Sequence, residues 1–409
     1  MMPKTNLQHL FSVPVIVAAL GYFVDIYDLL LFGIVRIPSL NDLGLSKSEV
    51  SEVGAAILNW QMTGLLLGGI LWGVLGDKKG RLTVLFGSIL TYSLANIACG
   101  FVQGPVAYKL LRFIAGIGLA GELGAGITLV SEILPSKLRA IGTSLVAGIG
   151  LLGAVFAYFT AEWFDWRTAY LVGGGMGIGL LLLRVGVFES GVFQNLKEHQ
   201  HIRKGNFFSL FTNADRLGRY LRCIGIGLPT WFVIGILATF SNEFGDALGI
   251  QPAIQPGLSI MWCYVGLSAG DIASGFISQW LGSRRKAVLL LMLLTLFASA
   301  FYLFGGLQTV NMHYGTMLLL GFGIGYWAMF VTIGAEQFGT NLRATAATTI
   351  PNMVRGMVVL MTTSFGFFKG LFSVTGAGAA VGVICFVIGI YSVLSSRETH
   401  GKDLDFFEY

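Results

Sequence analysis

Twelve long apolar runs constrain the fold of this chain more than any other feature. Crossing the hydrocarbon core of a bilayer takes about 20 apolar residues in a helix, and helices satisfy their own backbone polar groups in lipid. Hydrophobic residues make up 55% of the 409 residues and charged residues 11%, which is more apolar surface than a soluble core could bury. We therefore predict an all-α integral membrane protein whose spanning helices lie at about 11–36, 49–75, 82–103, 106–134, 140–162, 168–189, 219–244, 256–281, 286–308, 311–337, 343–370 and 374–395.

The positive charges predict the orientation in the bilayer. Most of the 26 Lys and Arg residues fall on one side if the amino terminus is inside, and cytoplasmic loops are the ones that retain such residues. Both termini are then cytoplasmic, and the net charge of +5 calls for no nucleic-acid partner. No Asn-x-Ser/Thr sequence occurs, which favours a bacterial inner membrane.

Several kinds of chemistry have no matching residues in the sequence. The four cysteines, Cys99, Cys223, Cys263 and Cys385, have no spacing typical of a disulfide framework or a metal site. No clustered nucleophile, metal-ligand set or phosphate-binding loop is present. We expect neither an enzyme nor a cofactor, and energy from an ion gradient rather than from ATP.

An internal repeat divides the chain into two similar parts. Residues 131–140 reappear as residues 335–344, and in each copy a Glu closes one helix and an Arg opens the next. Such repeats build transporters from two bundles around a central site. We predict two pseudo-symmetric six-helix bundles, 1–189 and 219–409, joined by a cytoplasmic linker at 190–218.

A short charged loop is expected to act as a latch between helix ends. Residues 73–81 read Gly-Val-Leu-Gly-Asp-Lys-Lys-Gly-Arg, where small residues permit close approach and the charges can lock or release it. The counterpart at 278–286 has Gln279 where Asp77 would be expected. The predicted gating residues are Gly73, Asp77, Gly80, Arg81, Glu132, Arg139, Glu336 and Arg343.

The order of these motifs resembles the major facilitator superfamily, in particular its sugar-porter, metabolite:proton symporter and organic-ion branches. The resemblance also rests on Tyr27-Asp28, the Arg112–Gly118 segment, Trp166-Arg167, Glu189-Ser190 and residues 397–404. Glu122, and Asn352 with Arg355, are similar to the metabolite:proton and organic-ion branches. Arg397 stands where sugar porters have Pro, and no Pro follows Ser190. The resemblance implies a transporter, usually monomeric, that works by alternating access.

Ionisable residues inside spans are expensive and therefore functional candidates. Asp28 and Arg112 lie at similar depth, at about 1.5 Å per residue. A carboxylate facing a guanidinium there would be weakened by protonation, so we hypothesise that Asp28 carries a coupling proton and Arg112 tunes it. Asp25, one turn earlier, is the rival carrier, and a permanent salt bridge is the structural alternative.

Three further buried charges leave alternatives open. Glu122 is interpreted as a second proton site or a substrate contact, or as a neutral acid bonded to a neighbouring carbonyl. Arg355 favours an anionic or zwitterionic substrate if it is unpaired. A pair between Arg355 and Asp271 would instead make both structural.

Aromatic and amide residues supply the remainder of a predicted cavity. The wider set at plausible depth includes Tyr22, Trp231 and Tyr264. The preferred substrate-binding residues, with Arg355 and Asp271, are Trp262, Tyr326, Trp327 and Asn352.

These observations favour a symporter that moves a small organic metabolite with protons across the lipid bilayer. An uncoupled facilitator or a proton antiporter of the same fold is the alternative, and a transport-dead sensor is a reading from another class. The charge of the substrate stays open. Arg355 favours an anion, Asp25 with Glu122 a cation, and the resemblance to sugar porters a neutral polyol.

Overall fold

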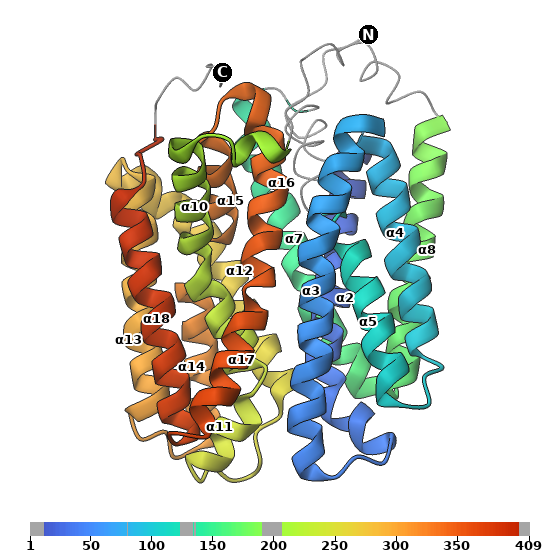
Figure 1. Cartoon of the computed structure of the whole chain (residues 1–409), viewed down its shortest axis with the longest axis vertical. Helices are drawn as coiled ribbons and strands as arrows, with labels where there is room; N and C mark the ends of the chain where they lie inside the picture. The colour runs from blue at the N-terminus through green and yellow to red at the C-terminus, as the bar shows by residue number, and fades with distance from the viewer. Residues whose placement is uncertain (1–11, 80, 123–133, 135, 190–206, 401–409) are drawn as a thin grey trace.

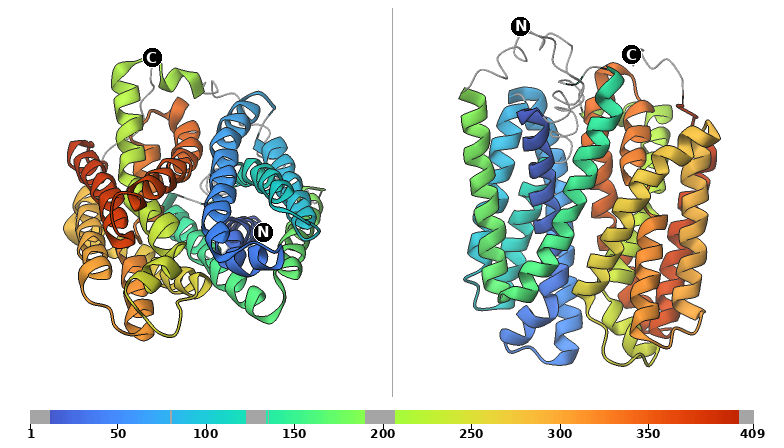
Figure 2. Two further views of the ribbon diagram at one scale, coloured as in Figure 1. Left: turned by 60° about the horizontal axis from the view of Figure 1, so that its bottom comes forward. Right: turned by 180° about the vertical axis from the view of Figure 1, so that it is seen from behind.

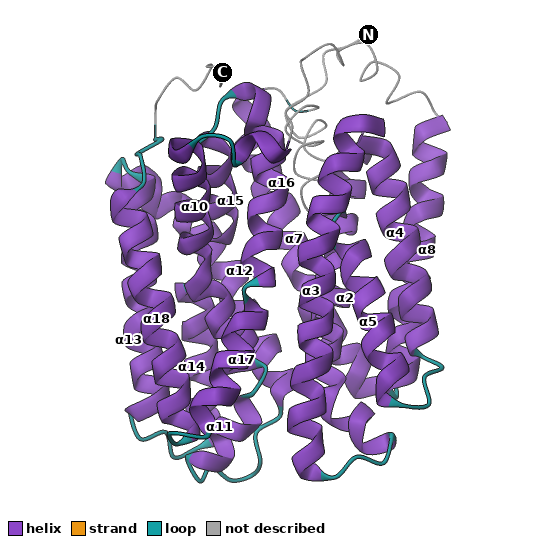
Figure 3. Cartoon of the chain, viewed as in Figure 1, coloured by secondary structure: helices purple, strands orange, loops and turns teal. Residues whose placement is uncertain are grey.

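The structure is a computed structural model that describes residues 12–79, 81–122, 134, 136–189 and 207–400. Within these ranges its regular structure is entirely helical (Figure 3). The helices stand side by side in two groups, which we call the first half and the second half (Figure 1).

The first half contains the helices up to residue 189. The helix α2 packs extensively on α7, α3 on α5, and α4 on both α5 and α8. The bounds of these helices are α2 Val13–Asp42, α3 Lys47–Lys79, α4 Arg81–Cys99, α5 Pro105–Leu119, α7 Ser136–Trp163 and α8 Trp166–Glu189.

The second half has a similar set of helices, but three of its spans are divided. One span consists of α10, the π-helix η2 and α11, a second of α14 and α15, and a third of α16 and α17. The bounds are η1 Phe207–Leu210, α10 Ala214–Phe232, η2 Val233–Ala238, α11 Ser241–Ala247, α12 Pro256–Leu281, α13 Arg284–Phe304, α14 Val310–Gly323, α15 Trp327–Glu336, α16 Thr340–Gly356, α17 Val358–Lys369 and α18 Val374–Ser395.

Nine helical segments in the described part of the chain are long and apolar enough to cross a bilayer. Three predicted spans are missing from that set for different reasons. Val84–Cys99 is a shorter apolar helix. Of the predicted span 106–134, residues 123–133 lie outside the described part. The helix α16 ends at Gly356, within the predicted span 343–370. The architecture is that of the predicted helical membrane protein, with interruptions that hydropathy does not reveal.

The two ends of the molecule differ in which connections they carry. The helix α2 begins and α18 ends at the same end, uppermost in Figure 1, and we call this end the termini face. The α2–α3 and α11–α12 connections lie at the opposite end, which we call the far face (Figures 1 and 2). Of the expected linker at 190–218, residues 190–206 lie outside the described part, and α10 already begins at Ala214.

Glycines allow the helices of each half to approach closely. A methyl group on Gly64 of α3 would overlap the main-chain oxygen of Phe113 in α5, and one on Gly116 of α5 would overlap that of Gln61 in α3. Small residues at these contacts bring the backbones together, as in many membrane helix pairs. Gly116, in the Arg112–Gly118 segment that supports the family resemblance, therefore has a packing role.

The second copy of the repeated charge motif forms a cluster at the termini face. Glu336, at the end of α15, is ion-paired with Arg284, at the start of α13. The carboxylate of Glu398 accepts a hydrogen bond from the Ser283 hydroxyl and from the backbone N–H of Arg284, at 3.1 Å. These contacts tie α13, α15 and the segment after α18 together.

Most of the first copy cannot be compared with this cluster. Gly80 and Glu132 lie outside the described residues, and the side chains of Asp77, Arg81 and Arg139 lie outside them as well. Gly73 faces α16, where a methyl group would be 3.7 Å from Thr349. Arg343 is partly buried in the first turn of α16. The gating role of these residues stays a prediction.

The Glu398 carboxylate caps the start of α13, where it accepts hydrogen bonds from the N–H groups of Arg284 and Arg285. This contact predicts a contribution to folding stability that depends on pH. Burial alone would raise its pKa, but hydrogen bonds from Ser283 and from the backbone N–H groups of His400, Arg284 and Arg285 outweigh it and lower the pKa to about 2. A carboxyl whose folded pKa lies below its unfolded value of about 4.3 stabilises above that pH and loses its effect as the pH falls toward 2. Glu398→Ala should cost about 1 kcal/mol at neutral pH, measured by thermal unfolding in detergent, and the deficit should shrink below about pH 4.

The control is Glu52→Ala, which removes an exposed carboxylate on α3. It should leave the melting temperature unchanged at both pH values. An equal loss in both variants would contradict the capping role of Glu398.

Candidate functional site

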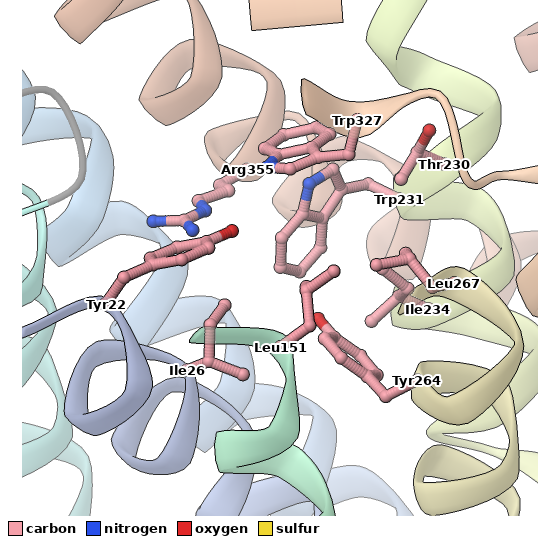
Figure 4. Close-up of a pocket in the computed structure, with 10 residues that line it drawn as sticks. All are labelled: Tyr22, Ile26, Leu151, Thr230, Trp231, Ile234, Tyr264, Leu267, Trp327 and Arg355. Carbon is pink, nitrogen blue, oxygen red and sulfur yellow. The ribbon is translucent and has the colours of Figure 1, made fainter. Parts of the chain in front are cut away.

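A cavity lies between the two halves, near the middle of the helices (Figure 4). It is largely apolar and aromatic, with one cationic side chain, that of Arg355. Its lining residues come from α2, α7, α10, η2, α12, α15 and α16, and they are Tyr22, Ile26, Leu151, Thr230, Trp231, Ile234, Tyr264, Leu267, Trp327 and Arg355.

The cavity is contracted in this structure. The space that a water molecule can enter is about 10 Å³, which is about the room for one water. An organic molecule would fit only after the lining side chains or the two halves move apart. The lining residues are therefore in place, but the cavity is too small for an organic substrate in this state.

Each interrupted span of the second half contributes to this cavity. Pro229 lies in α10 just before the π-helix, and Trp231 and Ile234 on either side of the α10–η2 junction face the cavity. Trp327 begins α15, and Arg355 occupies the last turn of α16. Proline and π-turns are common causes of bent or broken helices at functional sites. The negative end of the α16 dipole also favours a guanidinium at that position.

Arg355 is paired with an acid of the other half. Its Nη2 lies 3.6 Å from Oδ2 of Asp25 in α2, and both side chains are fully buried. The guanidinium carbon is 5.8 Å from the ring centre of Trp231, in cation–π range. Arg355 is thus neither unpaired nor bonded to Asp271, the two alternatives that its sequence position left open.

The polar atoms of the lining residues that lack a partner can all donate a hydrogen bond. Among the described residues, Nε and Nη1 of Arg355, Nε1 of Trp231 and the hydroxyls of Tyr22 and Thr230 are buried without a hydrogen bond. Figure 4 shows the Arg355 side chain reaching toward Tyr22. Guanidinium and indole nitrogens only donate, and buried unsatisfied donors are costly. This arrangement is suited to a ligand that brings acceptor atoms.

Asp28 and Arg112 meet in a different way from the one predicted. Arg112 donates to the main-chain oxygen of Asp28 at 2.9 Å, to Oδ1 of Asn96 at 2.6 Å and to Oε1 of Gln61 at 3.3 Å. The carboxylate oxygens of Asp28 are buried without a hydrogen bond to any residue in the described ranges. The expected face-to-face ion pair is replaced by a contact through the backbone.

Glu122 has a partner that the sequence did not indicate. Arg184 of α8 donates two hydrogen bonds to its carboxylate, the one from Nη1 at 3.1 Å, and both side chains are buried. Arg184 was not singled out by its sequence position, about 8 Å from the end of its predicted span. The need of Glu122 for a counter-charge at its own depth was the signal that could have identified Arg184.

Asp271 caps an interrupted helix instead of facing the cavity. Its Oδ1 accepts a hydrogen bond from the N–H of Ala328 at 3.0 Å, in the first turn of α15. The close approach is possible because Gly270 and Gly325 pack directly against each other, where a methyl group on either would overlap main-chain atoms. Asp271 therefore helps to fix the direction of Trp327.

Of the other four predicted substrate-binding residues, one lines the cavity and three do not. Trp327 lines it. Asn352 instead donates to the main-chain oxygen of Ala120, at 2.8 Å across the two halves. The Tyr326 hydroxyl donates to the main-chain oxygen of Ile226, and Trp262 is 36% exposed. From the wider aromatic set, Tyr22, Trp231 and Tyr264 line the cavity.

Arg36 was not singled out by its sequence position, and it joins the two halves near the far face. Its Nη2 donates to the main-chain oxygen of Thr239 at 3.0 Å and to Oδ1 of Asn242 at 2.9 Å, and its guanidinium lies over the ring of Phe240. Ser51 of α3 adds a hydrogen bond to Glu243 of α11 at 2.6 Å. The halves are therefore closed against each other on this side of the cavity.

No metal or redox site competes with this cavity among the residues that the structure describes. They contain no group of three His, Cys, Asp or Glu side chains able to hold a metal ion. The cysteines are buried and free.

Comparison with known proteins identifies the family. The family model described as Major Facilitator Superfamily matches residues 18–363. The chain belongs to this superfamily. As a major facilitator protein it is a membrane transporter and not an enzyme.

Two curated relatives and one solved structure illustrate the similarity. The niacin transporter NiaP of Acinetobacter baylyi is 27% identical, over 95% of this chain and 94% of its own. The gentisate transporter of Corynebacterium glutamicum is 26% identical, over 80% of this chain and 75% of its own. The fold is similar to that of the proton:xylose symporter XylE bound to 6-bromo-6-deoxy-D-glucose, with a TM-score of 0.73, 16% identity and 98% of each chain covered.

The capping role of Asp271 in this transporter can be separated from substrate contact. Asp271→Asn retains an oxygen that can accept from Ala328 and should leave thermal stability almost unchanged. Asp271→Ala leaves a partly buried N–H without a partner, which should cost about 1 kcal/mol. If Asn lowers the melting temperature as much as Ala does, the carboxylate charge and not the cap is what matters.

Proposed function

We propose that this transporter is a proton-coupled symporter that carries a small planar organic carboxylate into the cell by alternating access. The observation that carries the proposal is the donor-rich aromatic cavity around Arg355. Arginine binds carboxylates through two parallel hydrogen bonds, and Trp231, Trp327, Tyr22 and Tyr264 provide aromatic surfaces for a flat ring. Niacin and gentisate, the named substrates of two relatives, are both aromatic carboxylic acids.

The same geometry favours an anionic substrate over a cation or a neutral polyol. A cation would meet Arg355 at the cavity wall, where a like charge is repelled. A neutral polyol needs many donors and acceptors, whereas most of this wall is apolar. A carboxylate attached to a ring uses both the donors and the aromatic surface.

Buried acids near the cavity are the proposed sites for the coupled proton. Asp25 and Asp28 of α2 are the candidates for the proton carrier, with Arg112 and the Glu122–Arg184 pair as charged neighbours. The similarity in fold to a named proton symporter supports the coupling. Lone acids beside arginines are also more typical of proton sites than of sodium sites, which use clustered hydroxyl and carbonyl oxygens.

Alternating access would come from rocking of the two halves, residues 1–189 and 219–409, about the central cavity. With both termini in the cytoplasm of a bacterium, the far face is periplasmic, and the contacts of Arg36 and Ser51 close the cavity to the outside. Residues 190–218 would serve as the cytoplasmic tether, and one chain suffices as the working unit.

Binding of matched ligand pairs tests the substrate class. Nicotinate should raise the melting temperature of the purified protein, whereas nicotinamide, with a neutral amide in place of the carboxylate, should not. Arg355→Gln should weaken nicotinate binding by roughly 10–100-fold, the effect of losing a hydrogen bond to a charged group. The matched control is Arg167→Gln, because Arg167 bonds to Asp42 and Val102 away from the cavity.

Equal stabilisation by acid and amide, or by a sugar alone, would contradict a carboxylate site. Uptake into proteoliposomes then tests coupling and direction. Accumulation driven by an inward proton gradient fits symport. Equilibration without accumulation identifies a facilitator, and accumulation driven only by an outward gradient identifies an antiporter.

A further inference from the structure

The pair between Asp25 and Arg355 is held differently from the other buried ion pair near the cavity. Glu122 and Arg184 share two hydrogen bonds and belong to the same half. Asp25 and Arg355 lie 3.6 Å apart and belong to opposite halves. Both carboxylate oxygens of Asp25, and Nε and Nη1 of Arg355, have no hydrogen-bond partner in the described part of the molecule. The guanidinium therefore retains donors for a second carboxylate.

The charges around Asp25 balance in this state. The Glu122–Arg184 pair and the Asp28 and Arg112 side chains each combine an acid with an arginine. Glu122 and Asp28 both lie close enough to Asp25 for their charges to act on it. The uncharged phenols of Tyr22 and Tyr264 face the same space. Within the described residues, Asp25 is the acid that neutralises Arg355.

A substrate carboxylate would disturb this balance. Two carboxylates and one guanidinium leave one uncompensated negative charge in a buried, water-poor site, which costs several kcal/mol. Protonation of Asp25 removes that charge. One proton and one carboxylate then enter together, and the net charge of the site does not change.

We infer that Asp25 is the coupling acid of this transporter and that it acts by exchange: the substrate carboxylate replaces Asp25 on the Arg355 guanidinium while Asp25 takes up one proton. The inference rests on the proposed carboxylate substrate. The proton bonds to an Asp25 carboxylate oxygen, the ion pair to Arg355 breaks, and the hydrogen bonds between Arg355 and the substrate form. When the substrate leaves, Asp25 releases the proton and pairs with Arg355 again.

The exchange explains why neither partner would cross alone. A proton on Asp25 without substrate leaves Arg355 charged and unpaired in the interior. Substrate without the proton leaves the excess negative charge described above. Both states are penalised, so the ratio of transport is one proton for each carboxylate.

Asp28 is the second buried acid of α2, and its arginine neighbour differs from that of Asp25. It lies on the same helix, is equally buried, and has an unpaired carboxylate. Its arginine neighbour, Arg112, has its guanidinium bonded to Asn96, Gln61 and the main-chain oxygen of Asp28, and none of these three residues lines the cavity. A substrate on Arg355 therefore displaces Asp25 and not Asp28.

Calorimetric titration of the purified full-length protein with nicotinate, in buffers that differ in their heat of ionisation, measures the proton uptake on binding. The wild type should take up close to one proton per nicotinate, and its affinity should fall by up to tenfold per unit of rising pH. Asp25→Asn should bind nicotinate with no proton uptake and with an affinity that does not change with pH. Asp28→Asn should retain the uptake of the wild type.

Proton uptake that persists in Asp25→Asn, or that disappears only in Asp28→Asn, would overturn the exchange. If the Asp25→Asn protein does not fold, retained uptake in Asp28→Asn, in Asp271→Asn and in the double variant Glu122→Gln/Arg184→Gln still identifies Asp25, and loss in any of them refutes it. Binding of nicotinate by the wild type without any proton uptake would overturn the exchange but leave the substrate class intact. Absence of binding for both nicotinate and gentisate would overturn the proposed function and the exchange together.

Discussion

A buried carboxylate and a buried guanidinium from opposite halves meet at the centre of this molecule, and their contact links α2 to α16 beside the cavity. In a medium of low dielectric constant, separating such a pair without compensation costs about 3–5 kcal/mol. The pair between Asp25 and Arg355 therefore joins the halves only while each lacks another partner. That condition turns a structural contact into a control point, because a proton and a carboxylate can together replace it.

The backbone of the second half is arranged to expose this control point. If α10, α14 and α16 continued as unbroken helices, their backbone N–H and C=O groups would be hydrogen-bonded within each helix. Only side chains would then face the cavity. Instead, Trp231 precedes a π-helix, Trp327 starts a new helix that Asp271 caps, and Arg355 lies in the last turn of α16. Irregular backbone is tolerated at membrane depth where it lines a cavity. The three interruptions thus bring a cation and two indole rings to one place.

The sequence was sufficient for the fold and for the depth of the candidate residues, but not for their direction. Apolar runs, the repeat of residues 131–140 and the motif order predicted the architecture. Distance along a helix placed Asp28 and Arg112 at similar depth. Which residue each one faces depends on helix rotation, and helices that are apolar on all sides carry little signal for it. This is why Arg355 was compared with Asp271, why Arg184 was not identified as the partner of Glu122, and why Trp262 was preferred to Trp231.

Infrared difference spectroscopy tests the central claim most directly, because it reports the protonation state of a single buried acid when a ligand binds. On addition of nicotinate, protonation of Asp25 should produce a new carbonyl stretch of a carboxylic acid. That band should be absent in Asp25→Asn and present in Asp28→Asn. A band that survives in Asp25→Asn, or a wild-type spectrum in which nicotinate binds and no acid becomes protonated, would contradict the account.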